Sequence, residues 1–169
     1  VRIHREIVYH RTGKNYIGHI DFFDLVFNGN FKRLENFCRL MIDYPPFPEK
    51  LPIKWSANFI VSPKLTKNVL AMMKQSGCKR LFFGIESGSN KVLKLMKKNY
   101  DISVAKRIMK DAHEVGIKVT NNFMFGFPGE TEKDFEKTLD YIREAGKYID
   151  MAYPSRTYCA LEEFSYMYE

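Results

Sequence analysis

Residues 80–89 read RLFFGIESGS, and residues 119–131 read VTNNFMFGFPGET. Each stretch is an apolar run typical of a buried strand, and each ends abruptly in glycine, polar residues and the start of a helix. A buried parallel strand has no structural need for Glu86 or for the neighbouring pair Asn121 and Asn122. Polar groups at the carboxyl ends of such strands are where α/β barrels and open α/β sheets build their sites. The two stretches therefore predict a parallel α/β fold and a functional site at its strand ends.

The same strand-and-helix unit recurs along the chain roughly every 30 residues, the length that a parallel crossover requires. Strands are expected at residues 18–27, 53–61, 80–85, 118–125 and 148–153. The intervening helices end at Gly77, Gly116 and Gly146, where glycine supplies the left-handed residue that follows many helices. The sequence predicts an α/β fold of about five parallel strands alternating with helices. Periodicity alone leaves open whether the sheet is a doubly wound layer or part of a barrel.

The composition is that of one ordinary globular domain, with 169 residues of which 45% are hydrophobic and 28% charged. No apolar run reaches the roughly 18 residues that a membrane span needs. Three cysteines and many lysines suit a reducing, cytoplasmic location. The net charge of +7 is scattered, and its densest group is Lys91, Lys94, Lys97 and Lys98. A solvated helix face explains that group, so neither a nucleic acid nor a membrane is expected as a partner.

Metal ligation and nucleophilic catalysis find no support in the residue spacing. Cys38 lies on an apolar helix face, Cys78 follows a helix-ending glycine, and Cys159 stands near the end of the sequence. No two cysteines are close enough for a metal-binding pair, and the histidines show no HExxH spacing. Walker and Gly-x-Gly-x-x-Gly phosphate loops are absent as well. We therefore predict no metal ligand and no catalytic nucleophile in this chain.

Polar residues recur at the carboxyl ends of all the expected strands. They are Asp24, Ser56 with Asn58, Glu86 with Ser87, Asn121 with Asn122, and Ser155 with Arg156. Parallel strands bring these ends to one edge, which favours a ligand pocket over a series of coincidences. Ligand contact is favoured for Glu86, whereas turn capping would explain Asp24 and Asn58 equally well. The turn at residues 126–130 permits close backbone approach to a flat group such as a nucleobase, or is a plain structural turn.

Taken in order, several stretches resemble the radical S-adenosylmethionine (radical SAM) enzymes, and in particular their cobalamin-binding subgroup. They are FFDLVFNGN at 22–30, WSAN at 55–58, SGCKRLFFGIESGS at 76–89, VLKLMKK at 92–98 and NFMFGFPGET at 122–131. The resemblance covers nearly the whole chain, which makes it more specific than any single motif. It implies a partial (β/α)6 TIM-like barrel, with the cofactor lying across the carboxyl ends of the strands.

The resemblance also implies roles for matching residues in binding S-adenosylmethionine. Glu86 would bind the ribose hydroxyls, helped by Ser87 and by Asn122 on the next strand. Lys98, on the helix that follows Glu86, would face the methionine carboxylate, and Asp24 would meet the methionine amine. These pairings agree with elementary charge complementarity. The other members of the expected cofactor-binding set are Asn58 and the adenine-packing turn with Gly126, Phe127 and Gly129.

The sequence departs from this family in one respect, because the Cys-x-x-x-Cys-x-x-Cys loop that holds its 4Fe–4S cluster is absent. The resemblance places that loop, the first barrel strand and a cobalamin domain upstream of Val1. Residues 1–169 are therefore expected to form one truncated radical SAM core domain. The parent enzyme would generate a 5′-deoxyadenosyl radical from S-adenosylmethionine with the cluster, with or without cobalamin. This segment alone is expected to be inactive.

The expected partners are the cofactor, a substrate of unknown identity and the upstream domain of the same polypeptide. A sheet edge left without its first strand would also permit self-association. Two alternatives belong to different functional classes. One is a non-catalytic basic scaffold that binds RNA, and the other is a metal-free barrel enzyme in which Glu86 acts as a general acid or base.

Overall fold

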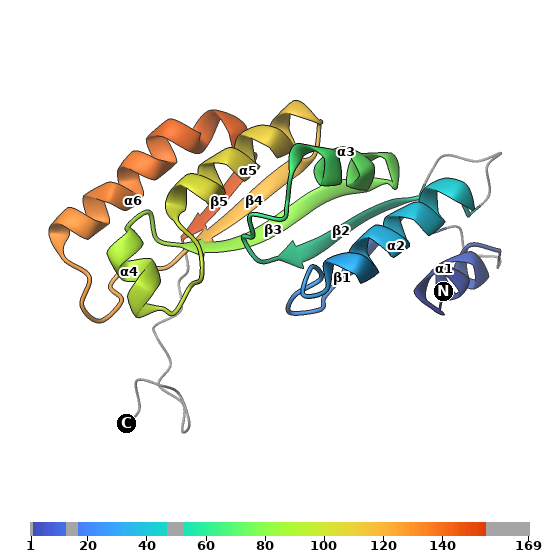
Figure 1. The fold of residues 1–169 in the computed structure, drawn as a ribbon, viewed down its shortest axis with the longest axis horizontal. Coiled ribbons are helices and arrows are strands. Elements are labelled where there is room, and N and C mark those ends of the chain that lie inside the picture. The colour runs from blue at the N-terminus through green and yellow to red at the C-terminus, as the bar shows by residue number, and fades with distance from the viewer. Residues whose placement is uncertain (1, 13–16, 47–52, 155–169) are drawn as a thin grey trace, which may run out of the picture.

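A single parallel sheet carries the fold, and its strands follow one another in the order of the chain (Figure 1). The computed structural model describes residues 2–12, 17–46 and 53–154. The sheet has 5 strands in the order β1-β2-β3-β4-β5, and every neighbouring pair is parallel. They are β1 (His19–Phe22), β2 (Lys54–Phe59), β3 (Cys78–Glu86), β4 (Lys118–Phe123) and β5 (Met151–Pro154). The prediction of about five parallel strands is confirmed.

The helices cover one face of this sheet. They are α1 (Arg2–Thr12), α2 (Phe31–Asp43), α3 (Lys67–Gln75), α4 (Asn90–Leu95), α5 (Ile102–Glu114) and α6 (Glu132–Ala145), followed by the short 3-10 helix η1 (Gly146–Tyr148). Figure 1 shows α2, α3, α5 and α6 in a row over the same face. A doubly wound sheet reverses its strand order and carries helices on both faces. The sequential order and the one-sided helices are instead those of a partial barrel.

Side chains along the strands alternate between the helix-covered face and the open inner face. The buried positions beneath the helices are Trp55, Ala57, Phe59, Leu81, Phe83, Ile85, Val119 and Phe123. The alternate positions are mostly polar or small, with Phe82 as an apolar exception, and they include His19, Asp21, Ser56, Asn58, Arg80, Phe82, Gly84, Glu86, Thr120 and Asn122. The hydrophobic core therefore lies between the sheet and the helices, and the polar face is the inner side of the barrel fragment.

An aromatic cluster around Trp55 fills the core under α2. The rings of Phe27, Phe37 and Trp55 lie with their centroids 5.5 to 5.6 Å apart, and Phe22 and Phe59 extend the cluster on either side. Trp55 is fully buried, and its indole N–H donates to the carbonyl of Ser76 at 3.1 Å. The ring thus has a partner for its polar atom while it buries a large apolar surface.

The expected strand at residues 18–27 was too long. β1 ends at Phe22, and the following residues form a loop in which the side chains of Phe23 and Leu25 are 87% and 93% exposed. The chain returns to the core at Phe27, whose backbone N–H donates to the carbonyl of Asn58 at 2.9 Å. The apolar run at 18–27 is therefore longer than the strand, because its apolar residues after Phe22 belong partly to an exposed loop.

One expected helix boundary and one expected glycine conformation were also wrong. Lys98 does not lie on a helix, because α4 ends at Leu95 and α5 starts at Ile102, with Asp101 capping the first turn through Ser103 N at 2.8 Å. Gly146 does not adopt the left-handed conformation, since its φ is −54° and the chain continues into η1. Asp101 precedes α5 as a typical N-cap residue, a signal that predicts this break.

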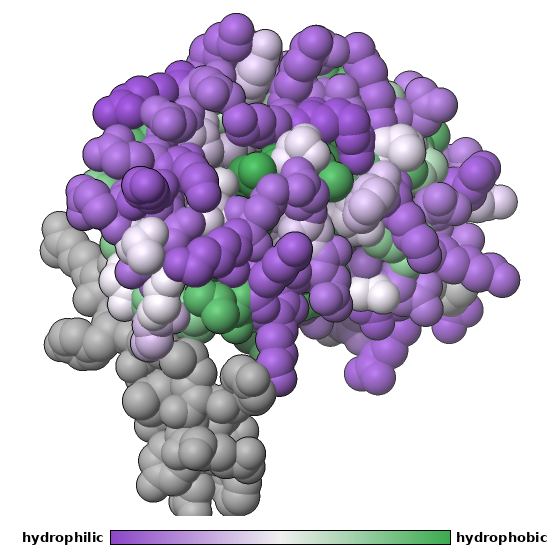
Figure 2. Space-filling model, turned by 60° about the vertical axis from the view of Figure 1, so that its left-hand side comes forward, coloured by the Kyte–Doolittle hydropathy of each residue, from purple (hydrophilic) through white to green (hydrophobic). Residues whose placement is uncertain are grey.

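The outer surface of the helices is predominantly hydrophilic on the face that Figure 2 shows, with smaller hydrophobic areas between the helices. This is the pattern of amphipathic helices whose apolar sides face a sheet. Within the described residues, none of the helices is long and apolar enough to cross a membrane.

Replacing Trp55 by alanine is expected to lower the free energy of unfolding by about 3–5 kcal/mol, because it removes the centre of the aromatic cluster and leaves a cavity. Chemical denaturation of the two proteins measures the difference. Tyr44→Ala is the control, since Tyr44 is 67% exposed and its loss should change stability by less than about 0.5 kcal/mol. Similar effects of the two substitutions would contradict the placement of Trp55 in the core.

Candidate functional site

The carboxyl end of β3 is built around an unusual backbone conformation at Glu86. Its φ is +67°, in the left-handed region that non-glycine residues avoid. The pairing with β4 shifts register here, because Gly84 lies opposite Asn122 while Glu86 lies opposite Phe123. The Glu86 carbonyl accepts from Met124 N at 2.9 Å, and the Tyr100 hydroxyl donates to the Ile85 carbonyl at 2.9 Å. Flanking hydrogen bonds therefore hold Glu86 in a conformation it would not choose by itself.

The carboxylate of Glu86 lies over Gly84, on the inner face of the sheet. A side chain at position 84 would place its Cβ only 2.4 Å from Glu86 Oε1, so glycine is required for this close approach. The Lys98 ammonium lies 3.5 Å from the same carboxylate oxygen and 3.4 Å from the Gly84 carbonyl. Both charged side chains keep solvent contact, with 21% of Glu86 and 32% of Lys98 exposed. They form a loose pair in which each group retains capacity for a ligand.

The loop after Glu86 is fastened to α6. Gly88 N donates to the Thr138 hydroxyl at 2.9 Å, and the Ser87 and Thr138 hydroxyls lie 3.1 Å apart. Gly88 packs directly against the backbone of α6, because a Cβ there would lie 2.4 Å from the Lys137 carbonyl. Ser87 is fully buried in this contact. Its side chain therefore points toward α6 and away from Glu86.

Asp134 makes a second connection between the loop and α6. Its carboxylate accepts from the Ser89 hydroxyl at 2.7 Å and from the Lys91 ammonium at 2.8 Å, and it completes a capping box with Thr131. Lys91, together with the Thr131 and Ser89 hydroxyls, holds the pKa of this carboxyl well below its usual range. Asp134 is therefore an anion under all ordinary conditions, fixing the start of α4 to the start of α6.

The pair Asn121 and Asn122 is divided between the two faces of β4. Asn122 is exposed on the inner face, opposite Gly84 in the register. Asn121 is fully buried beneath the helices, where its amide N–H2 donates to the Tyr141 hydroxyl at 3.2 Å. Its carbonyl oxygen has no hydrogen-bond partner within the part of the chain that the structure describes. Only Asn122 is therefore placed beside Glu86.

The turn after β4 stands next to this site. Gly126 and Gly129 have φ angles of +75° and +87°, and Gly126 N donates to Glu130 Oε2 at 2.6 Å. The Gly129 carbonyl accepts from Lys91 at 2.9 Å, which joins the turn to α4. Open space surrounds the position of a Cβ at Gly126. Phe127, between the glycines, is half-buried. Hydrogen bonds therefore hold the turn at both glycines, and its backbone is open to space at Gly126.

Asp24 and Asn58 lie on the other side of the inner face, over β1 and β2. Asn58 donates from its amide to the Asp24 carbonyl at 3.1 Å, while the Asp24 side chain is exposed. Phe82 of β3 is the register neighbour of Asn58 and separates this pair from Gly84 and Glu86. The expected site residues thus form two groups on one face, with Ser87 behind them. Ser155 and Arg156 lie outside the described residues.

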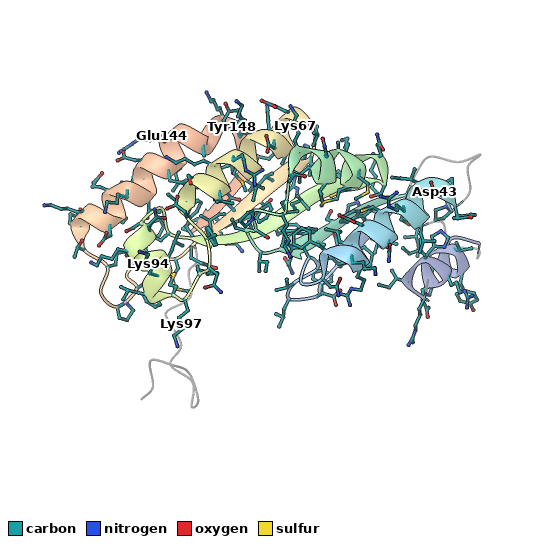
Figure 3. The ribbon with its side chains drawn as sticks, in the orientation of Figure 1. Asp43, Lys67, Lys94, Lys97, Glu144 and Tyr148 are labelled. Carbon is teal, nitrogen blue, oxygen red and sulfur yellow. The ribbon has the colours of Figure 1, made fainter. Side chains whose placement is uncertain are left out.

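The four clustered lysines have separate environments. Lys91 pairs with Asp134 and Lys98 with Glu86. Figure 3 shows Lys94 of α4 and Lys97, just after it, at the end of the molecule that carries the site. The cluster is therefore partly a set of internal ion pairs and not simply a solvated helix face.

The described cysteines do not offer metal ligands. Cys38 and Cys78 are both buried, and burial raises the pKa of the Cys38 thiol to about 11 and that of Cys78 well above its usual value. Cys159 lies outside the described residues. Within residues 2–12, 17–46 and 53–154, no group of three or more His, Cys, Asp or Glu side chains is arranged to hold a metal ion.

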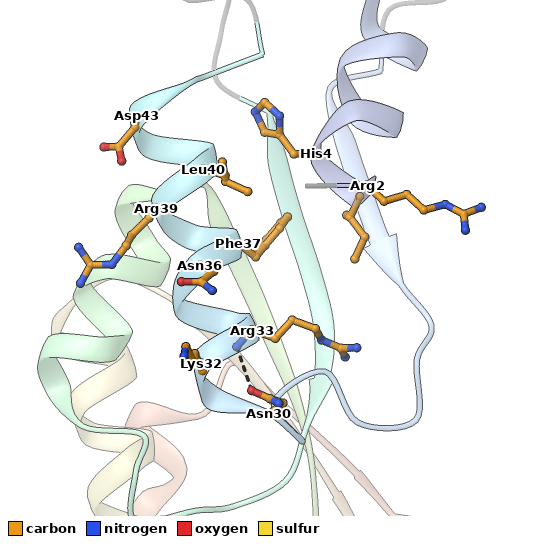
Figure 4. A pocket seen from close by; sticks show the side chains of 11 residues that line it. Arg2, His4, Asn30, Lys32, Arg33, Asn36, Phe37, Arg39, Leu40 and Asp43 are labelled. Atoms are coloured by element: carbon orange, nitrogen blue, oxygen red, sulfur yellow. Dashed lines mark hydrogen bonds between the residues drawn. The ribbon is translucent and has the colours of Figure 1, made fainter.

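A cavity of about 750 Å³ lies between α1 and α2, outside the group of residues around Glu86. Phe37, Leu40 and His4 lie between the two helices, whereas Arg39 and Arg2 extend away from the gap on opposite sides (Figure 4). The basic side chains therefore do not converge on a common point. This groove is on the helical layer, away from the polar strand ends, and we assign it no part in the site.

The sequence stretch around Glu86 includes Gly84 and Gly88, but neither their contacts nor the part of Thr138 could be predicted from it. Gly84 and Gly88 flank Glu86 in the sequence, but each is needed for a contact that only the folded chain reveals. Thr138 contacts a loop 50 residues earlier, and nothing in its local sequence indicates this. Thr131 and Asp134 have the sequence spacing of a capping box, but their link to Ser89 does not follow from that spacing.

Comparisons with known proteins identify the family and the fold of the chain. The family model of the radical SAM superfamily matches residues 4–142. The chain is 35% identical over 116 residues to the tRNA-2-methylthio-N(6)-dimethylallyladenosine synthase of Carboxydothermus hydrogenoformans, covering 64% of this chain and 25% of that protein. The chain therefore spans about a quarter of the length of the curated relatives it matches.

Solved structures with the same fold include two that are described as radical S-adenosylmethionine enzymes. Coproporphyrinogen III oxidase from Escherichia coli superimposes with a TM-score of 0.68 at 17% identity, covering 90% of this chain and 36% of that one. The cobalamin-dependent enzyme OxsB superimposes with a TM-score of 0.63 at 19% identity, covering 83% and 21%. At these identities the likeness shows the fold alone.

Gly88→Ala is expected to lower the free energy of unfolding by about 1–3 kcal/mol, because the added methyl group collides with the backbone of α6. Thermal or chemical denaturation measures the change. The matched control is Gly146→Ala, where the backbone is helical and no atom lies within 4 Å of the added Cβ. The control should be neutral or slightly stabilising. Equal behaviour of the two variants would contradict the close contact between the loop and α6.

Proposed function

The chain belongs to the radical SAM superfamily, and on that premise we propose that it binds S-adenosylmethionine at the carboxyl ends of β3 and β4. The observation that carries the proposal is the pair of Glu86 and Lys98, an acceptor and a cation held 3.5 Å apart on the inner face. A carboxylate suits the ribose hydroxyls, which are hydrogen-bond donors, and an ammonium suits the carboxylate of the methionine part.

The residues around this pair support the fit. Because Gly84 has no side chain, the Glu86 carboxylate occupies the space beside it. Nothing at position 84 then separates this carboxylate from the Lys98 ammonium. Asn122 is the register neighbour of Gly84 and adds an amide that donates and accepts hydrogen bonds beside the ribose. The turn at Gly126, Phe127 and Gly129 offers exposed backbone and an aromatic ring for the adenine.

The remaining residues of the expected cofactor-binding set are Ser87, Asp24 and Asn58, and not all of them contact the cofactor in this proposal. Ser87 is engaged with Thr138, so we assign it to holding the loop in place. Asp24 carries the expected contact with the methionine amine, and Asn58 fixes the backbone of Asp24 through its amide hydrogen bond of 3.1 Å. Binding and orienting the cofactor is then the work of the loops after β1, β3 and β4 together with Lys98.

When bound and reduced, S-adenosylmethionine supplies the radical chemistry after which the superfamily is named. The described residues do not provide ligands for an iron–sulfur cluster, since Cys38 and Cys78 are buried among apolar side chains. The proposal for this chain is therefore limited to binding and orienting the cofactor. It assigns no reaction step to a residue of the chain.

The activity of the whole protein is a further proposal. The curated relatives include tRNA-2-methylthio-N(6)-dimethylallyladenosine synthases and an uncharacterized methyltransferase of Pyrococcus horikoshii, whereas OxsB is described as cobalamin-dependent. We propose a radical SAM enzyme as the parent protein and retain cobalamin as a second cofactor only by analogy with OxsB. The substrate follows from neither name, because the chain spans about a quarter of those relatives.

Calorimetric titration of the 169-residue chain with S-adenosylmethionine tests the proposal. Glu86→Gln and Lys98→Ala should each weaken binding by about 10- to 100-fold, because each removes a charge-assisted hydrogen bond. Lys94→Ala is the control, since Lys94 is an exposed lysine of α4 that forms no ion pair within the described residues. Failure of the chain to bind the cofactor, or equal losses in all three variants, would contradict the proposal.

A further inference from the structure

The inner face of the sheet holds a pocket that the proposed cofactor site does not fill. It has a volume of about 270 Å³ and is lined by Asp21, Phe22, Phe23, Ser56, Asn58 and Phe82. We propose that this pocket is the substrate subsite, and that it takes a flat, uncharged or cationic heterocycle with N–H donors. The proposal rests on the proposed function, since it places a substrate beside the cofactor, but apart from Asn58 its contacts belong to different residues.

A hydrogen-bonded group of three side chains forms the polar wall. Nε2 of His19 lies 2.9 Å from Asp21 Oδ1 and 3.0 Å from Ser56 Oγ. Both contacts involve the same ring nitrogen, so this group is not the relay of a hydrolytic triad, in which the imidazole uses one nitrogen for each partner. An Nε2–H shared by the two oxygens satisfies both contacts. The hydroxyl hydrogen of Ser56 is then free to bind a ligand.

The remaining groups of the wall are acceptors. The second carboxylate oxygen of Asp21 has no partner within the described residues, and half of this side chain is exposed. Asn58 lines the pocket and uses its amide N–H2 for the Asp24 carbonyl, so its side-chain oxygen is left as an acceptor. Two acceptors and one hydroxyl donor select a ligand that carries N–H groups. The charge of Asp21 also disfavours an anion.

The apolar walls select a ring. Phe82 lies on the inner face between Asn58 and Thr120 in the register, and it is only half-buried. Phe23 is 87% exposed at the rim, which is unfavourable for an aromatic side chain unless a partner covers it. A flat ring would stack on these side chains while its edge meets the polar wall. The pocket volume lies just below the usual range for drug-sized ligands, so it suits a single heterocycle.

The pocket is close to the proposed cofactor. Phe82, Gly84 and Glu86 occupy alternate positions of β3 and so share its inner face. The distance from Phe82 to Glu86 along the strand is about 13 Å, from a rise of about 3.3 Å per residue. A ring held at Phe82 therefore lies within one small-molecule length of a cofactor held at Glu86, as a substrate must.

Three probes that differ in one group test this proposal: 2-aminopyrimidine, pyrimidine and pyrimidine-2-carboxylate. Each is titrated into the isotope-labelled 169-residue chain, and binding is followed by amide chemical shifts. We expect 2-aminopyrimidine to shift the amide signals of Ser56, Asn58 and Phe82. It should bind about five-fold more tightly than pyrimidine, because it adds N–H donors. Pyrimidine-2-carboxylate should not bind, and equal binding of all three probes would overturn the proposal.

Substitutions of pocket residues test whether 2-aminopyrimidine binds in this pocket. Asp21→Asn and Ser56→Ala should each weaken 2-aminopyrimidine binding by about five-fold. Lys118→Ala, an exposed residue of β4 outside the pocket, should leave it unchanged. If the pocket variants do not fold, the order of the three probes on the unmodified chain still decides. Binding of S-adenosylmethionine, measured on the same samples, separates the two proposals. A chain that binds the cofactor but not 2-aminopyrimidine overturns the subsite alone, whereas the reverse result overturns the cofactor proposal and, with it, the assignment of this pocket to a substrate.

Discussion

The close contact between Gly88 and the backbone of α6 is the constraint on which the site depends. Two segments about 50 residues apart meet there without an intervening side chain, and the Thr138 hydroxyl bonds both Ser87 and Gly88 N. The loop after β3 cannot adopt another path without losing these contacts. Glu86, directly before it, is thereby held with a φ of +67°. Such strain costs on the order of 1–3 kcal/mol and persists only where the surroundings enforce it.

The remaining geometry follows from the alternation of side chains in a parallel sheet. Residues beneath the helices form the core, and residues on the other face remain available because the helices cover one side only. Glu86, Asn122, Asn58 and Asp21 all occupy the available face. The fold therefore collects polar groups from separate strands, while the apolar cluster around Trp55 stabilises the same strands from behind.

Much of this arrangement could be predicted from local sequence patterns. The strand-and-helix alternation indicates parallel strands, and parallel strands place Glu86 and Asn122 at one edge whatever the exact topology. The same alternation also distinguishes the two asparagines, since Asn121 shares its face with Val119 and Phe123, which are buried. The structure adds that Asn121 donates to Tyr141, which explains a polar residue in the core.

The rest depends on contacts between distant segments. The side chain of Ser87 continues the alternation, since Phe83 and Ile85 also face the helices. The positive φ of Glu86 is different, because no local pattern predicts such an angle for glutamate. Lys98 lies in the segment between α4 and α5, because Asp101 caps α5 and so starts a separate helix. The pairing of His19 with Asp21 and Ser56 needs the register between β1 and β2, which the sequence does not specify.

A double-mutant cycle in the affinity for S-adenosylmethionine tests most directly whether the docked loop positions Glu86. Thr138→Val removes the hydroxyl that holds the loop after β3. Glu86→Gln removes the carboxylate that this loop positions in our account. If the first change acts through the second residue, the two losses of binding free energy should fall short of additivity by about 0.5 kcal/mol or more. Thr138→Ser, which retains the hydroxyl, should behave as the unmodified chain. Fully additive losses, or unchanged affinity in Thr138→Val, would contradict the account.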